Sequence, residues 1–184
     1  MTEVVRGTKE TQIRVELARG AGPARVRVPD PFLSHMLEAF AAWGGFRLAV
    51  EARGDLRHHT IEDVAITLGQ ALRGEIDVNR VRRTGFAYVP MDDALVRVAV
   101  DVVDRPFFAG ELPERLYTHF FRSFAFEARL TLHVDVLRGH DDHHVTEAAF
   151  KALGLALAQA LSPRESVLST KGEVETTRAR RRKR

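Results

Sequence analysis

Cysteine is absent from the 184 residues of the chain. This absence excludes disulfide bonds, thiolate zinc sites, iron–sulfur clusters and cysteine nucleophiles. The chain also lacks an apolar run near the roughly 20 residues that cross a bilayer, and residues 1–6 lack the apolar stretch of a signal peptide. We therefore expect a cytoplasmic protein with no membrane partner.

The overall composition is typical of a globular protein with a hydrophobic core, since 45% of the residues are hydrophobic and 29% are charged. The formal charge of +3 comes from residues 178–184, which hold six of the 28 basic side chains. Without them the formal charge is −3, from 22 basic and 25 acidic residues. We expect a disordered basic tail on a fold that is not basic. Nucleic-acid binding by the tail is the alternative that we do not favour.

The chain carries an internal repeat. Two segments share a hydroxyl residue, a histidine and a phenylalanine five residues later, and their histidines, His35 and His119, are 84 residues apart. Two further pairs of segments match at an offset of 85. The matched segments are 32–40 with 116–124, 58–62 with 143–147, and 68–72 with 153–157. Their constant order indicates a duplicated unit, and we expect one half at residues 1–84 and the other at 85–177, before the tail.

Each half shows the same coarse pattern. A helix with the lone histidine comes first, and in the first half it opens with Asp30 as a cap and Pro31 at the first helical position. A longer helix begins at the paired histidines and has apolar residues at helical spacing. Alternating stretches predict strands at 12–18, 24–28, 46–52, 85–89, 95–103 and 130–136. The prediction is an α+β fold of two half-domains, each a β-sheet packed with helices.

Six of the eight histidines fall within the repeated blocks. On a helix His58 and Glu62 would be about 40° apart on one face, whereas His59 would point about 100° away from His58. Adjacent histidines therefore cannot easily bind one ion, but they can serve two. Six imidazoles and two carboxylates divide evenly into two sites of three His and one Glu. The predicted ligands are His35, His58, His59, Glu62, His119, His143, His144 and Glu147.

Such a ligand set suits a borderline divalent ion such as Zn, Mn, Fe, Co or Ni, with open positions for a substrate. The alternative is a pH-sensitive interface in which the histidines pair with carboxylates. His133 and His140 have no counterpart in the repeat. We therefore do not expect either of them to be a metal ligand.

The chain resembles the imidazoleglycerol-phosphate dehydratase family of histidine biosynthesis, nearly from end to end. The segments that carry the resemblance are 6–11, 31–37, 58–63, 68–72, 90–95, 105–106, 119–121, 143–152 and 169–172. It implies a duplicated α+β fold related to the ribosomal S5 second-domain type. It also implies loss of water from imidazole glycerol phosphate, giving imidazole acetol phosphate, with two Mn²⁺ ions per active site. Trimers of the family build a 24-subunit homo-oligomer, and the active sites lie between subunits.

The resemblance also implies roles for single residues. Because the hydrogen that is lost sits on a carbon without an adjacent carbonyl, the substrate's own imidazole must take the charge, and an acid–base residue must then move the protons. Glu10 is the implied catalytic residue, with Glu62 and Glu147 as competitors. An arginine fork can bind two phosphate oxygens at once. The implied substrate-binding residues are Glu10, Arg80, Arg105, Lys151, Ser169 and Lys171.

The chain departs from the family at a few positions near the site. Ala39 and Trp43 stand where the family usually has Gln and His, and Leu56 and Arg57 stand where many members have two acidic residues. These departures leave the partners of His58 and His59 and the substrate contacts near residues 39–43 open. The alternatives in function are another two-metal enzyme, such as a hydrolase on the same scaffold, and a non-enzymatic binder driven by the tail.

Overall fold

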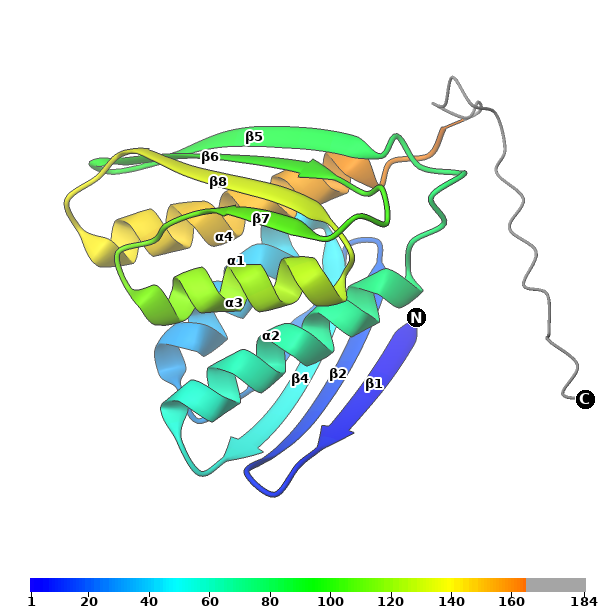
Figure 1. The fold of residues 1–184 in the computed structure, drawn as a ribbon, viewed down its shortest axis with the longest axis vertical. Coiled ribbons are helices and arrows are strands. Elements are labelled where there is room, and N and C mark those ends of the chain that lie inside the picture. Colours follow the sequence, from blue (N-terminus) through cyan, green and yellow to red (C-terminus); the bar gives the residue numbers. More distant parts are fainter. Residues whose placement is uncertain (165–184) are drawn as a thin grey trace, which may run out of the picture.

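The computed structural model describes residues 1–164, which form two four-stranded sheets with four helices between them (Figure 1). The first half contains β1 (Thr2–Gly7), β2 (Thr11–Arg19), β3 (Ala24–Arg27), α1 (Pro31–Gly44), β4 (Phe46–Gly54) and α2 (Arg57–Gly74). The second half contains β5 (Thr84–Met91), β6 (Ala94–Asp101), β7 (Phe107–Gly110), α3 (Arg115–Glu127), β8 (Thr131–Arg138) and α4 (Asp142–Ala160).

The two halves have the same topology. The strand order is β1-β2-β4-β3 in the first sheet and β5-β6-β8-β7 in the second. In each sheet the first three strands pair antiparallel, and the last strand joins its neighbour in parallel. The predicted duplicated α+β fold is therefore confirmed. The boundaries of the halves, at residues 84 and 177, stay a prediction.

Local sequence explains where the helices that carry the histidines begin. The Asp30 carboxylate accepts a hydrogen bond of 2.9 Å from the Leu33 backbone N–H, with Pro31 in the first turn of α1. The Asp141 carboxylate caps α4 by accepting hydrogen bonds from the backbone N–H groups of His143 and His144, at 2.8 and 3.1 Å. Both caps satisfy donors that a helix start leaves unpaired. They fix the orientation of the first turn, which contains His143 and His144 in α4 and directly precedes His35 in α1.

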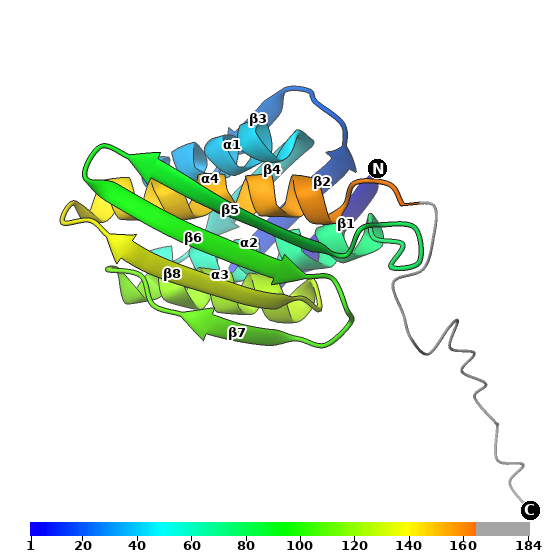
Figure 2. The same cartoon turned by 90° about the horizontal axis from the view of Figure 1, so that it is seen from above.

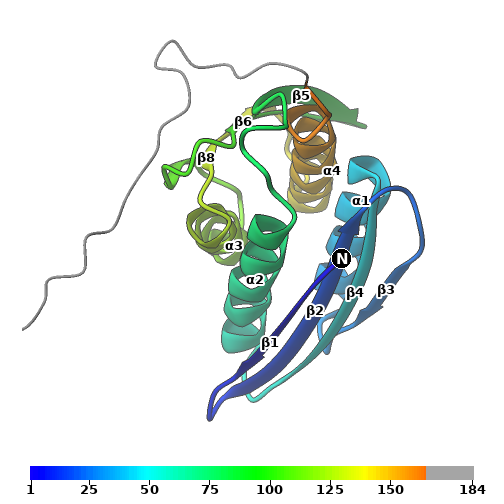
Figure 3. The same ribbon diagram turned by 90° about the vertical axis from the view of Figure 1, so that its right-hand side faces the viewer.

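The helices form a layer between the two sheets (Figures 2 and 3). Helix α1 packs on α4, and α2 packs on α3, so each contact joins one helix of each half. Glycines allow the close approach. A Cβ added at Gly154 would lie 2.6 Å from the Phe40 carbonyl oxygen, and one added at Gly69 would lie 2.7 Å from that of Phe124. The halves therefore share one core, and the helix starts are brought together.

We expect Gly154→Ala to destabilise the fold by about 1–3 kcal/mol, because the new methyl group would overlap backbone atoms of α1. Alanine is otherwise the better helix former by about 1 kcal/mol, so helix propensity alone predicts that Gly154→Ala stabilises the fold. Ala158→Gly at an exposed position of the same helix is the control and should cost about 1 kcal/mol. Urea unfolding measures both, and a stabilised Gly154→Ala variant would contradict this account of the helix crossing.

Within residues 1–164, no helix is long and apolar enough to cross a membrane. The predicted tail at 178–184 lies outside the described residues, as do Ser169 and Lys171.

Candidate metal centres

All four helices begin on the same side of the molecule, at left in Figure 1. There the histidines and glutamates of the repeat form two clusters. The Glu147 triad consists of His35 from α1 with His143 and Glu147 from α4, and the Glu62 triad consists of His58 and Glu62 from α2 with His119 from α3. Each triad thus combines one helix from each half, and the repeat relates the two triads to each other.

The geometry of each triad fits a divalent ion. In the Glu147 triad the Nε2 atoms of His35 and His143 lie 3.2 and 3.1 Å from one carboxylate oxygen. In the Glu62 triad the Nε2 atom of His58 lies 3.5 Å from one carboxylate oxygen of Glu62, and that of His119 lies 3.7 Å from the other. Within each triad, one ligand atom per residue lies within 4.8 Å of the others. Bonds of about 2.0–2.2 Å to a common ion require such spacing between nitrogen and oxygen donors.

The two triads differ in burial and charge. The Glu147 side chain is 7% exposed and the Glu62 side chain 34%. The Lys151 ammonium lies 2.8 Å from the Glu147 carboxylate, whereas Ile66 is the counterpart of Lys151 in the first half. Burial raises the pKa of Glu147, but hydrogen bonds from Lys151 and His35 outweigh it and lower the pKa overall. The carboxylate of this triad is therefore held in its charged form.

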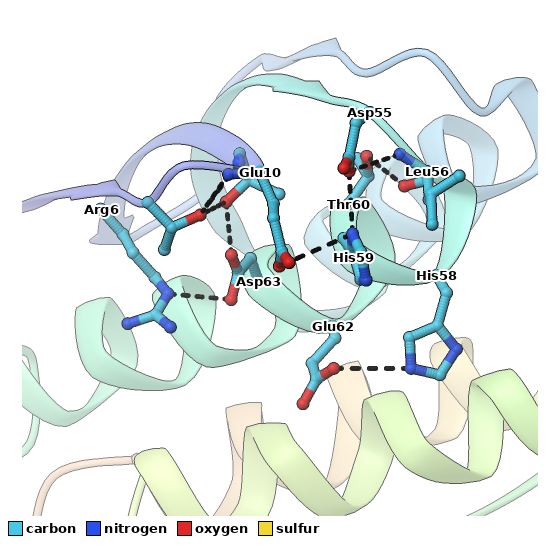
Figure 4. A network of polar contacts seen from close by, with 11 residues as sticks. Arg6, Glu10, Asp55, Leu56, His58, His59, Thr60, Glu62 and Asp63 are labelled. Atoms are coloured by element: carbon cyan, nitrogen blue, oxygen red, sulfur yellow. Dashed lines mark hydrogen bonds and ion pairs between the residues drawn. The ribbon is translucent and has the colours of Figure 1, made fainter.

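His59 and His144 join neither triad within residues 1–164. The His59 Nδ1–H donates to Asp55 over 2.8 Å, and Figure 4 shows this ring turned away from His58. His144 Nδ1 makes the corresponding 2.8 Å hydrogen bond to Asp93. The predicted divergence of adjacent histidines is thus found at both helices. At His59 the carboxylate on Nδ1 fixes the tautomer and leaves Nε2 as the nitrogen with a lone pair, the usual arrangement behind a metal-binding histidine. At His144 a carboxylate oxygen of Asp92 also lies 3.3 Å from Nε2.

The hydrogen bond to Asp55 raises the pKa of His59 above 6.5, with further contributions from the charges of Glu10 and Asp55. The same contact lowers the pKa of Asp55. The hydrogen bond to Asp93 likewise raises the pKa of His144. Since the folded-state pKa of His59 exceeds the unfolded value, its charged form stabilises the metal-free fold below pH 6.5. This contribution is lost as the pH rises through the folded-state pKa.

We expect Asp55→Asn to lower the pKa of His59 in metal-free protein, because the amide removes the negative charge next to the ring. NMR titration of the imidazole Hε1 proton measures the shift. Glu10→Gln is the matched control and should lower this pKa less, since Glu10 lies 3.6 Å from Nδ1 rather than 2.8 Å. An unchanged pKa in Asp55→Asn would contradict the observed hydrogen bond.

Arg57 connects the starts of three helices next to the Glu62 triad. Its guanidinium pairs with Asp30, which caps α1, over 2.5 Å, and with Glu114, which precedes α3. The hydrogen bond to Glu114 makes the largest contribution to a raised pKa of Arg57. The position that departs from the family pattern therefore carries a link between α1, α2 and α3.

The residues predicted to bind substrate are spread over the molecule. Glu10 lies between β1 and β2, next to His59, and its side chain is 57% exposed. Lys151 contacts Glu147 directly. The loops that contain Arg80 and Arg105 follow α2 and β6 and lie on the other side of the molecule from the helix starts (Figure 1). Since 18 residues of α2 span about 27 Å, Arg80 is remote from both triads of its own chain.

Sequence reasoning missed three residues that shape the site. Asp55 precedes His59 by four residues, so helical spacing could have indicated it as a partner. Asp93 lies 51 residues before His144, and only the tertiary fold shows their contact. Arg57 was visible only as a departure from the family pattern.

Together, the fold and the site define a duplicated α+β protein with two His₂Glu clusters of the kind that bind divalent metal ions. The model of the imidazoleglycerol-phosphate dehydratase family matches residues 29–157, and the chain belongs to this family of histidine-biosynthesis hydro-lyases. The chain is 49% identical over 183 residues to the imidazoleglycerol-phosphate dehydratase of Pyrobaculum aerophilum, covering 91% of this chain and 97% of that protein. It is 43% identical over 189 residues to that of Geobacter metallireducens, covering 93% and 97%.

Solved structures of enzymes from the same family also match the fold of this chain. The fold matches a crystal structure of the enzyme from Pyrococcus furiosus with a TM-score of 0.83 and 40% identity, covering 93% of this chain and 100% of that one. It matches the Staphylococcus aureus enzyme with a TM-score of 0.80 and 36% identity, covering 89% and 99%.

Proposed function

We propose that this chain dehydrates imidazole glycerol phosphate to imidazole acetol phosphate with two divalent ions, Mn²⁺ in the cell, one at each triad. The observation that carries the proposal is the pair of His₂Glu triads, related by the repeat and lying on one side of the molecule. Mixed imidazole and carboxylate donors suit Mn²⁺ as well as Zn²⁺ or Fe²⁺. A cytoplasmic location is part of the same proposal.

Each triad offers three donors, whereas the predicted sites contain three histidines and one glutamate. His59 and His144 are the remaining donors, and their Asp-bound rings are 28% and 29% exposed. We propose that they complete the triads of a neighbouring copy in a homo-oligomer, a 24-subunit particle built from trimers. This arrangement also accounts for Arg80 and Arg105, since a neighbouring copy can bring its far side to the triads.

The ions would act as Lewis acids that polarise the substrate's imidazole ring when bound. The chain's own residues transfer the proton and bind the phosphate. Glu10, exposed and 3.6 Å from the His59 ring, accepts or returns the proton at carbon, with Glu62 and Glu147 as the alternative carboxylates. Arg80 and Arg105 bind the phosphate through charge-assisted hydrogen bonds, together with Ser169 and Lys171 beyond the described residues. Lys151 faces the substrate from the Glu147 triad.

Exhaustive chelation of the purified oligomer should abolish dehydration of imidazole glycerol phosphate, and Mn²⁺ should restore it. Metal analysis should find two ions per chain in the active sample. Full turnover in a demonstrably metal-free sample would contradict the metal requirement. Hydrolysis of a phosphorylated substrate without any dehydration would favour the other two-metal enzyme, and a nucleic-acid affinity lost on deletion of residues 178–184 would favour the binder.

A further inference from the structure

Trp43, the single tryptophan of the chain, lies in the last turn of α1 with 43% of its surface exposed. The Lys151 ammonium nitrogen lies 5.2 Å from the centre of its indole ring. The same nitrogen lies 2.8 Å from a Glu147 oxygen and 3.8 Å from the Met91 sulfur. Lys151 is 18% exposed. The ammonium group is therefore held between the carboxylate of a triad and an aromatic face.

We propose that Trp43 is a positioning residue, whose indole holds the Lys151 ammonium against the Glu147 triad. A lysine side chain has four rotatable bonds and loses much rotamer freedom when it is fixed. A cation over an indole face within about 6 Å is attracted by the ring quadrupole. Without the ring, the ion pair with Glu147 and the longer contact with the Met91 sulfur would have to hold the side chain in place. The catalytic consequence rests on the proposed function, but the contact itself does not.

The fold explains why these two side chains meet. Lys151 lies one turn before Gly154, where α4 crosses α1 beside Gly44. The glycine contact draws the two helices together, so the end of α1 lies beside Lys151.

This arrangement serves only one of the two triads. Ile66 and Glu127 occupy the positions that correspond to Lys151 and Trp43 in the repeat. Glu127 accepts a hydrogen bond from Gln70 instead. The duplication therefore produced two similar metal clusters, and the Trp43–Lys151 pair makes one of them chemically distinct. A substitution of Trp43 should accordingly affect the site through Lys151 and leave the Glu62 triad unchanged.

Fluorescence of the single tryptophan tests the contact without reference to activity. In the intact, metal-loaded oligomer, Lys151→Met should shift the Trp43 emission maximum or change its intensity, because the charge next to the indole is lost. Arg122→Met serves as the control, since this arginine contacts Phe126 rather than Trp43. Emission unchanged by Lys151→Met would overturn the proposed contact.

Kinetics test the positioning role. We expect Trp43→Leu to lower kcat/KM for imidazole glycerol phosphate about 3- to 10-fold, the range expected from loss of one cation–π contact, with two ions still bound. Trp43→Phe keeps an aromatic face and should recover most of the loss. In a Lys151→Met background, Trp43→Leu should have little further effect, since the two residues act as one unit.

A purely structural role for Trp43 predicts a different pattern. Trp43→Leu would then lower kcat/KM by the same factor with or without Lys151, and this additive result would overturn the proposal. Wild-type kcat/KM in Trp43→Leu would also overturn it. If wild-type protein does not dehydrate the substrate at all, the proposed function fails, while the fluorescence result still decides whether Trp43 holds Lys151.

Discussion

His143→Ala should lose most dehydratase activity and the ion of the Glu147 triad. The triad offers three donors. Removal of one imidazole leaves two of them, and no other described side chain takes the place of the missing one. Loss of even an outer hydrogen-bond partner of a metal ligand costs about 10- to 100-fold in metal affinity or activity. Loss of the ligand itself should therefore lower kcat/KM by more than about 100-fold. Metal analysis of folded protein and a dehydration assay measure both effects.

His140→Ala is the matched control, because His140 is exposed in the loop just before α4. Its backbone N–H donates to Asp93 over 2.5 Å, and alanine keeps that group. This variant should retain two ions per chain and most of its turnover. Two bound ions in His143→Ala, or loss of an ion in His140→Ala alone, would show that the repeat does not identify the ligands.

Much of the fold was predictable because apolar periodicity is strong where an element is buried on one full face. Strand β2 alternates between buried and more exposed residues from Thr11 to Leu17 and lies at 11–19, against a prediction of 12–18. Strands β1 and β7 were not predicted, and both lie at sheet edges. Arg6 faces Asp63 from β1 over 2.9 Å, which interrupts the apolar pattern there. Strand β7 has the sequence FFAG, which lacks the alternation of apolar and polar residues that the equally short β3 shows in ARVR.

The site was predictable in part, because helical spacing indicates which residues of one helix share a face. The pairing of His58 with Glu62 follows from helical spacing alone, and the repeat extends it to His143 and Glu147. Which lone histidine joins which helix pair depends on how the halves pack. The contact of α1 with α4 brings His35 to the triad of the other half, and no local pattern predicts this exchange.

The separation of His59 from His58 has a consequence that can be measured. If His59 and His144 complete sites on neighbouring copies, two defective variants should complement each other in one mixed oligomer. One variant would carry Glu62→Ala with Glu147→Ala and so lack both triads. The other would carry His59→Ala with His144→Ala and keep both triads. Neither oligomer alone should bind two ions tightly, because each lacks donors at every site.

Mixed oligomers, formed by co-expression, should regain tightly bound metal. A site is complete where a triad from the second variant meets histidines from the first. With equal amounts and random neighbours in a symmetric oligomer, about a quarter of the ion sites should be complete. Mixing either double variant with itself is the control and should restore none. If all ligands of a site came from one chain, mixing would restore no tightly bound metal, so recovery of bound Mn²⁺ after gel filtration separates a shared site from a site closed within one subunit.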